Sequence, residues 1–189
     1  MGRRLSGTIG NDPNSDLTRL LESCTVTLSC GGKEGTGFFV GPGLALTCAH
    51  VVNRAAEGKE LAIGWGRKQY TGSLVQMFPT PYPTAGDVFP DVALVKVEIA
   101  EHPCVLLDSE FQARDPLYSF GYSGERPGGE SLTGDCEGSA NYQRANPDAE
   151  LIKFKDTQVL PGISGSPLLN QRTGAVCGIV KRTRGDGSP

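Results

Sequence analysis

Long apolar runs and histidines are both rare in this sequence of 189 residues, which contains 2 histidines. No stretch approaches the about 20 consecutive apolar residues that a helix needs to cross a bilayer. The N-terminal segment 1–17 contains arginines but not the apolar core of a secretory signal. We therefore expect no signal peptide and no membrane span.

Basic residues do not outnumber acidic ones: 18 Lys and Arg against 21 Asp and Glu give a formal net charge of -3. This balance argues against a nucleic-acid partner, because proteins bind nucleic acids through basic faces. The short basic cluster of Lys181, Arg182 and Arg184 is interpreted as the solvated end of a strand.

The 6 cysteines show no C-x₂-C spacing, and the two histidines are far apart in the sequence. We therefore expect no metal centre and no cofactor. Because no export signal precedes them, the cysteines are expected to be reduced thiols in the cytoplasm.

Glycine and proline are abundant, with 26 and 13 residues spread between short apolar runs. This pattern is typical of the turns in an all-β chain. One short N-terminal helix is predicted over Asp16–Ser23, with Ser15 as its cap. The predicted strands form two series: Thr25–Ser29, Thr36–Gly41, Leu44–Thr47, Glu60–Trp65, Gln69–Phe78 and Val92–Glu98, and then Pro116–Tyr122, Ser131–Gly138, Leu151–Lys155, Ser166–Asn170 and Ala175–Lys181.

Two series of similar length predict two β-barrels joined by a linker. Residues 1–24 would form an N-terminal extension with the helix, and residues 25–98 the first barrel. Residues 99–115 would cross between the barrels, and residues 116–189 would form the second one.

His50 is the better candidate for a general base, because it ends an apolar run where the chain turns sharply. His102 lies in the polar linker. Asp91 directly precedes an apolar strand, where a carboxylate can be partly buried and still accept a hydrogen bond from imidazole. Asp87 is the rival, but it lies in a loop-like segment. Each residue by itself also fits a structural role, as a half-buried histidine or a turn aspartate.

A serine between glycines marks the second half of the chain, in Gly162-Ile-Ser164-Gly165-Ser-Pro167. A nucleophile needs such a tight turn, and Gly162 lets the backbone N–H groups of residues 162 and 164 converge on a developing oxyanion. The same pattern is also common in an ordinary turn between strands.

Together these segments resemble the trypsin-like serine peptidases of the chymotrypsin fold, including the bacterial HtrA-like members. The family's T-A-A-H motif is similar to Thr47-Cys-Ala-His50, its D-[IV]-A-L motif to Asp91-Val-Ala-Leu94, and its G-[DN]-S-G-G-P motif to the segment around Ser164. Gly35-Thr-Gly-Phe-Phe-Val40 resembles the strand that precedes the histidine in HtrA-like members. The resemblance implies two packed six-stranded antiparallel barrels and a His50–Asp91–Ser164 triad. In this chain the second barrel is expected to be one strand short.

The sequence departs from the family at several positions. Ile163 replaces the usual Asp or Asn, so activation through a newly cut N-terminus is not expected. Val51 and Leu160 stand where secreted members have disulfide cysteines. The resemblance also implies which residues form the specificity pocket: Gln158, Val159, Leu160, Lys181 and Arg182. None of them is acidic, so a preference for Lys or Arg at the cleaved bond of the substrate is not expected.

The leading hypothesis is a serine endopeptidase acting on proteins or peptides, as the N-terminal effector module of a larger bacterial signalling or defence protein. A fused or associated regulatory domain is then expected as a partner. The alternatives are a catalytically silent regulatory or recruitment module of the same fold, completed by a partner or downstream domain, and a small esterase with the same triad.

Overall fold

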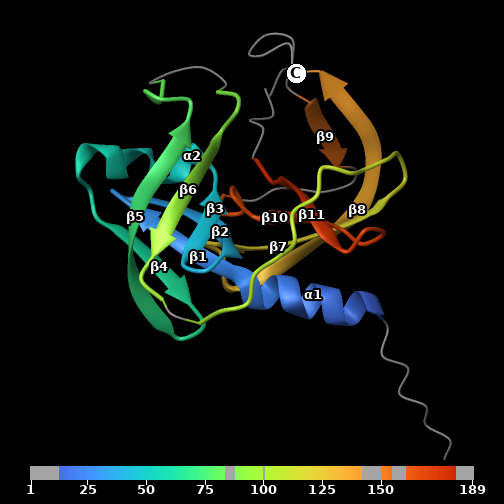
Figure 1. The fold of residues 1–189 in the computed structure, drawn as a ribbon, viewed down its shortest axis with the longest axis horizontal. Coiled ribbons are helices and arrows are strands. Elements are labelled where there is room, and N and C mark those ends of the chain that lie inside the picture. Colours follow the sequence, from blue (N-terminus) through green and yellow to red (C-terminus); the bar gives the residue numbers. More distant parts are fainter. Residues whose placement is uncertain (1–12, 84–87, 100, 142–149, 155–160, 182–189) are drawn as a thin grey trace, which may run out of the picture.

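The computed structural model describes residues 13–83, 88–99, 101–141, 150–154 and 161–181. The chain folds into two β-sheets that lie side by side, with one helix running below the second sheet and leading into the first (Figure 1). No helix among these residues is both long enough and apolar enough to span a membrane.

The first sheet is a closed barrel in the strand order β1-β2-β3-β6-β5-β4. Alternate side chains of its strands point inward, and Val26, Phe39, Ile63 and Val95 are completely buried in the core. Its strands are β1 (Thr25–Cys30), β2 (Lys33–Gly41), β3 (Leu44–Thr47), β4 (Leu61–Trp65), β5 (Lys68–Phe78) and β6 (Val92–Val97).

The second sheet has the order β11-β10-β7-β8-β9 and is curled without closing over the residues described. Its core contains Leu117, Ile163 and Leu168. Its strands are β7 (Pro116–Ser123), β8 (Arg126–Asn141), β9 (Glu150–Phe154), β10 (Pro167–Asn170) and β11 (Ala175–Ile179). The all-β double-barrel architecture predicted from the sequence is therefore confirmed, including a second barrel with five strands in the described residues.

Helix α1 (Pro13–Cys24) packs against both sheets. Its Leu21 and Cys24 lie in one apolar cluster with Phe38 of the first barrel and Leu169 of the second sheet. The helix begins before Ser15, which the sequence analysis predicted as its cap, because proline fits the first turn of a helix.

Two further features differ from the predicted elements. Strand β8 is longer than predicted, because it continues the hairpin with β7 as far as the pair Ser123–Arg126. The short helix α2 (Ala49–Val52) and the 3-10 helix η1 (Asn53–Glu57), which follow β3, were not predicted. Such short helices have too few residues to show a helical period in the sequence.

Candidate active site

His50 and Asp91 are brought together by two paired strands of the first barrel. Strand β3 leads into α2, which contains His50, and Asp91 directly precedes β6. The two strands are antiparallel, with Thr47 opposite Ala93. The end of β3 therefore lies beside the start of β6. This arrangement brings together His50 and Asp91, which are 41 positions apart in the sequence.

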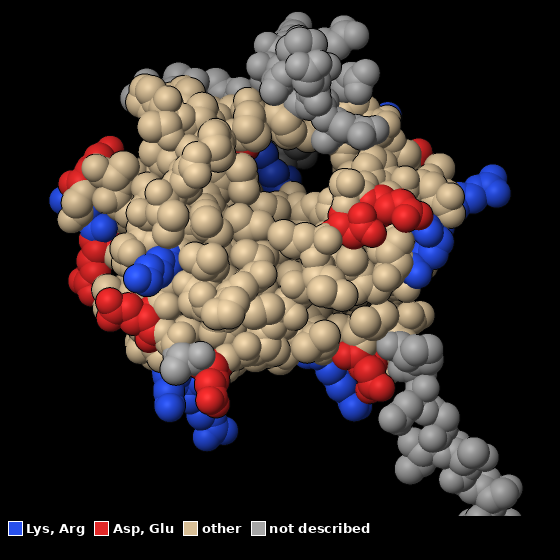
Figure 2. All heavy atoms as spheres, in the orientation of Figure 1, with Lys and Arg blue, Asp and Glu red and all other residues tan. Residues whose placement is uncertain are grey.

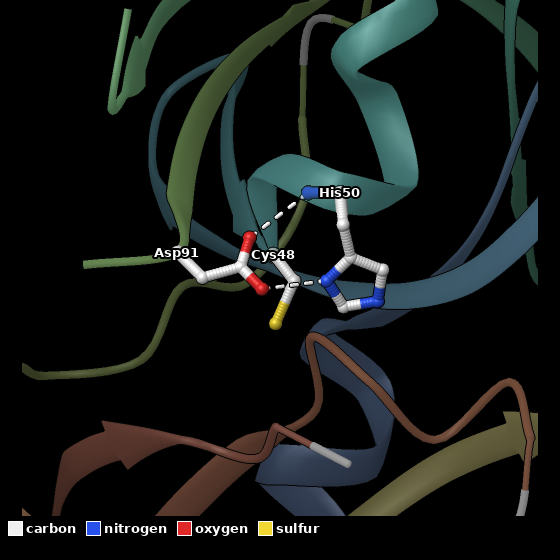
Figure 3. Close-up of side chains that lie close together, drawn as sticks. All are labelled: Cys48, His50 and Asp91. Atoms are coloured by element: carbon white, nitrogen blue, oxygen red, sulfur yellow. Dashed lines mark hydrogen bonds and ion pairs between the residues drawn. The ribbon is translucent and has the colours of Figure 1, made fainter. Parts of the chain in front are cut away.

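Two hydrogen bonds connect the pair (Figure 3). The Nδ1 atom of His50 lies 2.6 Å from Oδ2 of Asp91, and the backbone N–H of His50 donates to Oδ1 at 2.9 Å. An ionised carboxylate can only accept, so Nδ1 carries the proton and Nε2 keeps its lone pair. Figure 3 shows Nε2 on the side of the ring turned away from the carboxylate. The side chain of Asp91 is 2% exposed and that of His50 is 33% exposed, so the imidazole is accessible while the carboxylate is buried.

The environment keeps Asp91 ionised. Burial acts to raise the pKa of this carboxyl group, but the hydrogen bonds from His50 and the positive charge of Lys181 act against it, and the pKa is lowered. Burial and the charge of Asp91 raise the pKa of both the Cys48 thiol and the Tyr82 phenol, which therefore stay neutral at physiological pH.

The loop that contains Ser164 is attached to strand β2 of the first barrel. The backbone N–H of Thr36 donates to the carbonyl of Ser164 at 2.9 Å, and the Thr36 hydroxyl donates to the carbonyl of Gly162 at 2.9 Å. On its other side, the N–H of Gly165 donates to the carbonyl of Val180 at 2.8 Å. Ser164 is 5% exposed. The loop is therefore held by hydrogen bonds from both halves of the molecule.

Gly35 separates the Ser164 loop from the helix that contains His50. A Cβ atom at position 35 would lie 2.5 Å from Cγ2 of Val51, the residue after His50, and 3.1 Å from the carbonyl oxygen of Ser164. The serine backbone and the histidine helix thus flank the same glycine. The catalytic roles of His50, Asp91 and Ser164 and the oxyanion role of the Gly162 and Ser164 amides remain predictions.

The loop contains two glycines in a backbone conformation that other residues rarely adopt. Gly162 has φ +100° and Gly165 has φ +94°. Each also lies against neighbouring backbone: a Cβ atom would come within 2.7 Å of the Tyr122 carbonyl oxygen at position 162 and within 2.0 Å of the Thr36 carbonyl oxygen at position 165. The turn around Ser164 therefore requires glycine at both positions.

Lys181, which was predicted to line the specificity pocket, lies beside Asp91, and its pocket role remains a prediction. Its ammonium group donates to the carbonyl of Val88 and lies 3.5 Å from Oδ2 of Asp91. The other predicted pocket residues, Gln158, Val159, Leu160 and Arg182, lie outside the described residues, as does Asp87, the rival of Asp91. Figure 2 shows a hollow between the first barrel and the second sheet, with basic atoms inside it and a group of acidic atoms near one edge.

His102 has a structural role. Its ring stacks on Phe39 with the ring centroids 3.7 Å apart, and its Nε2 atom accepts the backbone N–H of Gly43 at 2.8 Å. Its Nδ1 atom therefore carries the proton and donates to the carbonyl of Pro103. A histidine with both ring nitrogens engaged by backbone groups is not available as a general base.

Cys48, His50 and Asp91 also offer three potential metal ligands, whose nearest atoms lie within 4.8 Å of one another. Two of those atoms already share the short hydrogen bond between imidazole and carboxylate. The thiol is protonated because burial raises its pKa, and the ammonium group of Lys181 would repel a cation. The arrangement therefore suits proton transfer better than metal binding.

Lys33 is a site residue that the sequence analysis missed. Its ammonium group donates to the backbone carbonyl of His50 and to the side-chain oxygen of Asn53, each at 3.0 Å. It ties the start of β2 to the histidine helix. No motif marks this lysine in the sequence, because the contact depends on how β2 and α2 pack.

Residues 35–179 match the family model of the trypsin-like peptidase domain. The chain belongs to this family. As a trypsin-like peptidase domain it is a serine protease, a hydrolase that acts on proteins or peptides. The family thus confirms the resemblance that the three motifs suggested.

Solved structures with the same fold are similar at low sequence identity. The active form of the Rv3671c protease from M. tuberculosis is 21% identical with a TM-score of 0.67, and the match covers 92% of this chain and 76% of that chain. Deg5 is 18% identical with a TM-score of 0.72, covering 90% of this chain and 85% of that chain. The HtrA-type protease AlgW with a tripeptide is 18% identical with a TM-score of 0.69, covering 88% of this chain and 53% of that chain. No match was found among the curated proteins.

Proposed function

We propose that this trypsin-like peptidase domain is an endopeptidase in which Ser164 is the nucleophile, His50 the general base and Asp91 the group that orients His50. The observation that carries the proposal is the pair of hydrogen bonds from His50 to one buried carboxylate, at 2.6 and 2.9 Å. They hold the imidazole in the tautomer that keeps Nε2 free to accept a proton.

In the first step the hydroxyl of Ser164 attacks the carbonyl carbon of the scissile peptide bond and transfers its proton to Nε2 of His50. The imidazolium is stabilised by Asp91, which stays ionised because its pKa is lowered. The negative charge on the carbonyl oxygen is accepted by the backbone N–H groups of Gly162 and Ser164.

In the second step the C–N bond breaks, and the imidazolium gives its proton to the leaving amine. Water then attacks the acyl carbon and loses a proton to His50. The bond between the acyl carbon and Oγ of Ser164 breaks, and the imidazolium returns the proton to Oγ, which releases the acid product and restores the hydroxyl. The triad acts as one unit, so loss of any member is expected to remove most of the rate.

The test is active-site labelling with a fluorophosphonate probe, together with cleavage of fluorescein-labelled casein. We expect the native chain to be labelled at Ser164, as mapped by mass spectrometry, and Ser164→Ala to lose both labelling and cleavage. Ser119→Ala is the matched control. The hydroxyl of Ser119 is buried in β7 without a hydrogen-bond partner in the described part of the chain, so its removal should leave folding and labelling unchanged.

Casein cleavage by Ser164→Ala at the native rate, with the fold intact by circular dichroism, would exclude Ser164 as the nucleophile. Labelling at another serine would exclude it as well. His50→Gln should retain the fold and lose labelling, because the probe reacts with an activated serine.

The alternative is a catalytically silent module of the same fold. It is favoured by the burial of Ser164, which is 5% exposed, because a substrate must reach the nucleophile before any bond can be cleaved. Labelling distinguishes the two: an assembled site reacts at Ser164, and a silent module stays unlabelled while folded.

We propose further that the protein acts in the cytoplasm, as the effector module of a larger bacterial signalling or defence protein, with a fused or associated regulatory domain. The 6 cysteines are all free thiols, which is compatible with a reducing compartment. Fractionation of the native organism with an antibody against this chain would test both the compartment and the size of the polypeptide. A secreted polypeptide of about the size of this chain would contradict both.

A further inference from the structure

The carboxylate of Asp91 is contacted from the second sheet by a lysine. Lys181 follows the end of β11, whereas Asp91 precedes β6 of the first barrel. The ammonium nitrogen of Lys181 lies 3.5 Å from Oδ2 of Asp91 and donates to the carbonyl of Val88. The contact therefore joins the two halves of the molecule at the candidate active site.

The same oxygen, Oδ2, accepts the Nδ1 proton of His50 at 2.6 Å. Two cationic groups would share this carboxylate once His50 takes a proton. The side chain of Lys181 is 28% exposed and that of Asp91 is 2% exposed, so solvent screens the contact only in part. A permanent positive charge at this position makes a protonated His50 less favourable than it would be beside Asp91 alone.

The other titratable groups near the pair act differently. Cys48 and Tyr82 are neutral at physiological pH, because burial raises the pKa of each. Lys33 contacts the backbone carbonyl of His50 and not the carboxylate. Among the described residues besides His50, Lys181 is therefore the cation that contacts Asp91.

We propose that Lys181 is a positioning residue of the active site, which holds Asp91 against the end of β11. Its positive charge also keeps His50 unprotonated at lower pH than Asp91 alone would allow, so that the enzyme stays active there. The proposal rests on the proposed function, since it concerns the same base. It assigns to Lys181 a role in the chemistry of the triad besides the predicted role in the specificity pocket.

The test is the pH dependence of the second-order rate of fluorophosphonate labelling. In Lys181→Met the acid limb of the profile should move to higher pH by about one unit, because an apolar side chain of similar length removes the charge. Lys181→Arg keeps the charge and should restore the native limb. Lys96→Met, on the exposed side of β6, removes a cation that does not contact the carboxylate and should leave the limb unmoved.

An acid limb in Lys181→Met that superimposes on the native one would overturn the proposal, even if the plateau rate falls, since a purely structural role lowers the plateau alone. Thermal unfolding of each variant separates a loss of fold from a change at the site.

A second readout does not depend on catalysis. In chains that also contain Ser164→Ala, the ¹³C carboxyl signal of Asp91 is followed by NMR from pH 7 downward. Asp91 should stay ionised to lower pH in the Ser164→Ala variant than in the variant that also has Lys181→Met, because the lysine lowers the pKa of Asp91. Equal titration of the two chains would refute the role of Lys181. If the native chain is never labelled by the fluorophosphonate, the proposed function is refuted. The NMR titration of Asp91 then still decides whether Lys181 acts on this carboxylate.

Discussion

Replacement of Gly165 by alanine should damage both folding and catalysis. The residue has φ +94°, and a Cβ atom would lie 2.0 Å from the carbonyl oxygen of Thr36 and 2.5 Å from the hydroxyl of Thr47. These two groups cannot move aside easily, because the Thr47 hydroxyl donates to that same carbonyl at 2.6 Å. An ordinary contact begins at 3.4 Å, so the Ser164 loop would have to move by about 1.4 Å.

The magnitude has two parts. The positive φ costs an alanine about 1–2 kcal/mol, and a steric conflict in a packed interior adds about 1–3 kcal/mol, so about 2–5 kcal/mol of folding stability should be lost. A displacement of about 1 Å at a nucleophile reduces the rate by about 100-fold.

The assays are urea unfolding, followed by circular dichroism, and the rate of fluorophosphonate labelling, with two matched glycines as controls. Gly138 has φ +110° with nothing within 4 Å of its Cβ position, so Gly138→Ala measures the backbone term alone. Gly128 has open space and no positive φ, so Gly128→Ala should be nearly neutral. Gly165→Ala with the stability of Gly138→Ala and the labelling rate of the native chain would refute the close approach of this loop to β2.

Two further predictions concern contacts outside the proposed triad. Hydrogen bonds from Arg172 hold the pKa of Asp115 well below its usual range. The ionised carboxylate therefore stabilises the fold fully above its pKa in the unfolded chain, about 3.9. This contribution to the free energy of unfolding is lost as the pH falls toward the lower pKa of the folded state. Asp115→Asn should therefore be less stable than the native chain at pH 7 in urea unfolding, with a difference that shrinks below pH about 4; a difference independent of pH would contradict this assignment. Lys33→Met removes the donor to the His50 carbonyl and should lower the labelling rate several-fold while changing stability by about 1 kcal/mol, whereas Lys68→Met, at the exposed start of β5, should change neither. Equal labelling rates for these two lysine variants would show that Lys33 does not position His50.

Much of the fold was predictable because its signals are local. The alternation of apolar residues and the turn glycines marked eleven strands, and strand β3 was predicted with its observed bounds, Leu44–Thr47. The long β8 was only partly predicted, since its first residues, from Arg126, are exposed or polar and pair with β7 through the hairpin. Pairing between strands depends on their neighbours as well as on their own pattern.

The amino-acid sequence by itself determined the strands, their division into two series and the order of the His50, Asp91 and Ser164 motifs, because each of these is encoded in a short segment. Only the tertiary structure decided that Lys181 reaches Asp91 from the other sheet, that Lys33 holds the His50 carbonyl and that Gly35 separates the serine loop from the histidine helix. Such contacts join residues far apart in the chain, and they exist only because closure of the first barrel and docking of the second sheet bring distant backbone within a few ångströms.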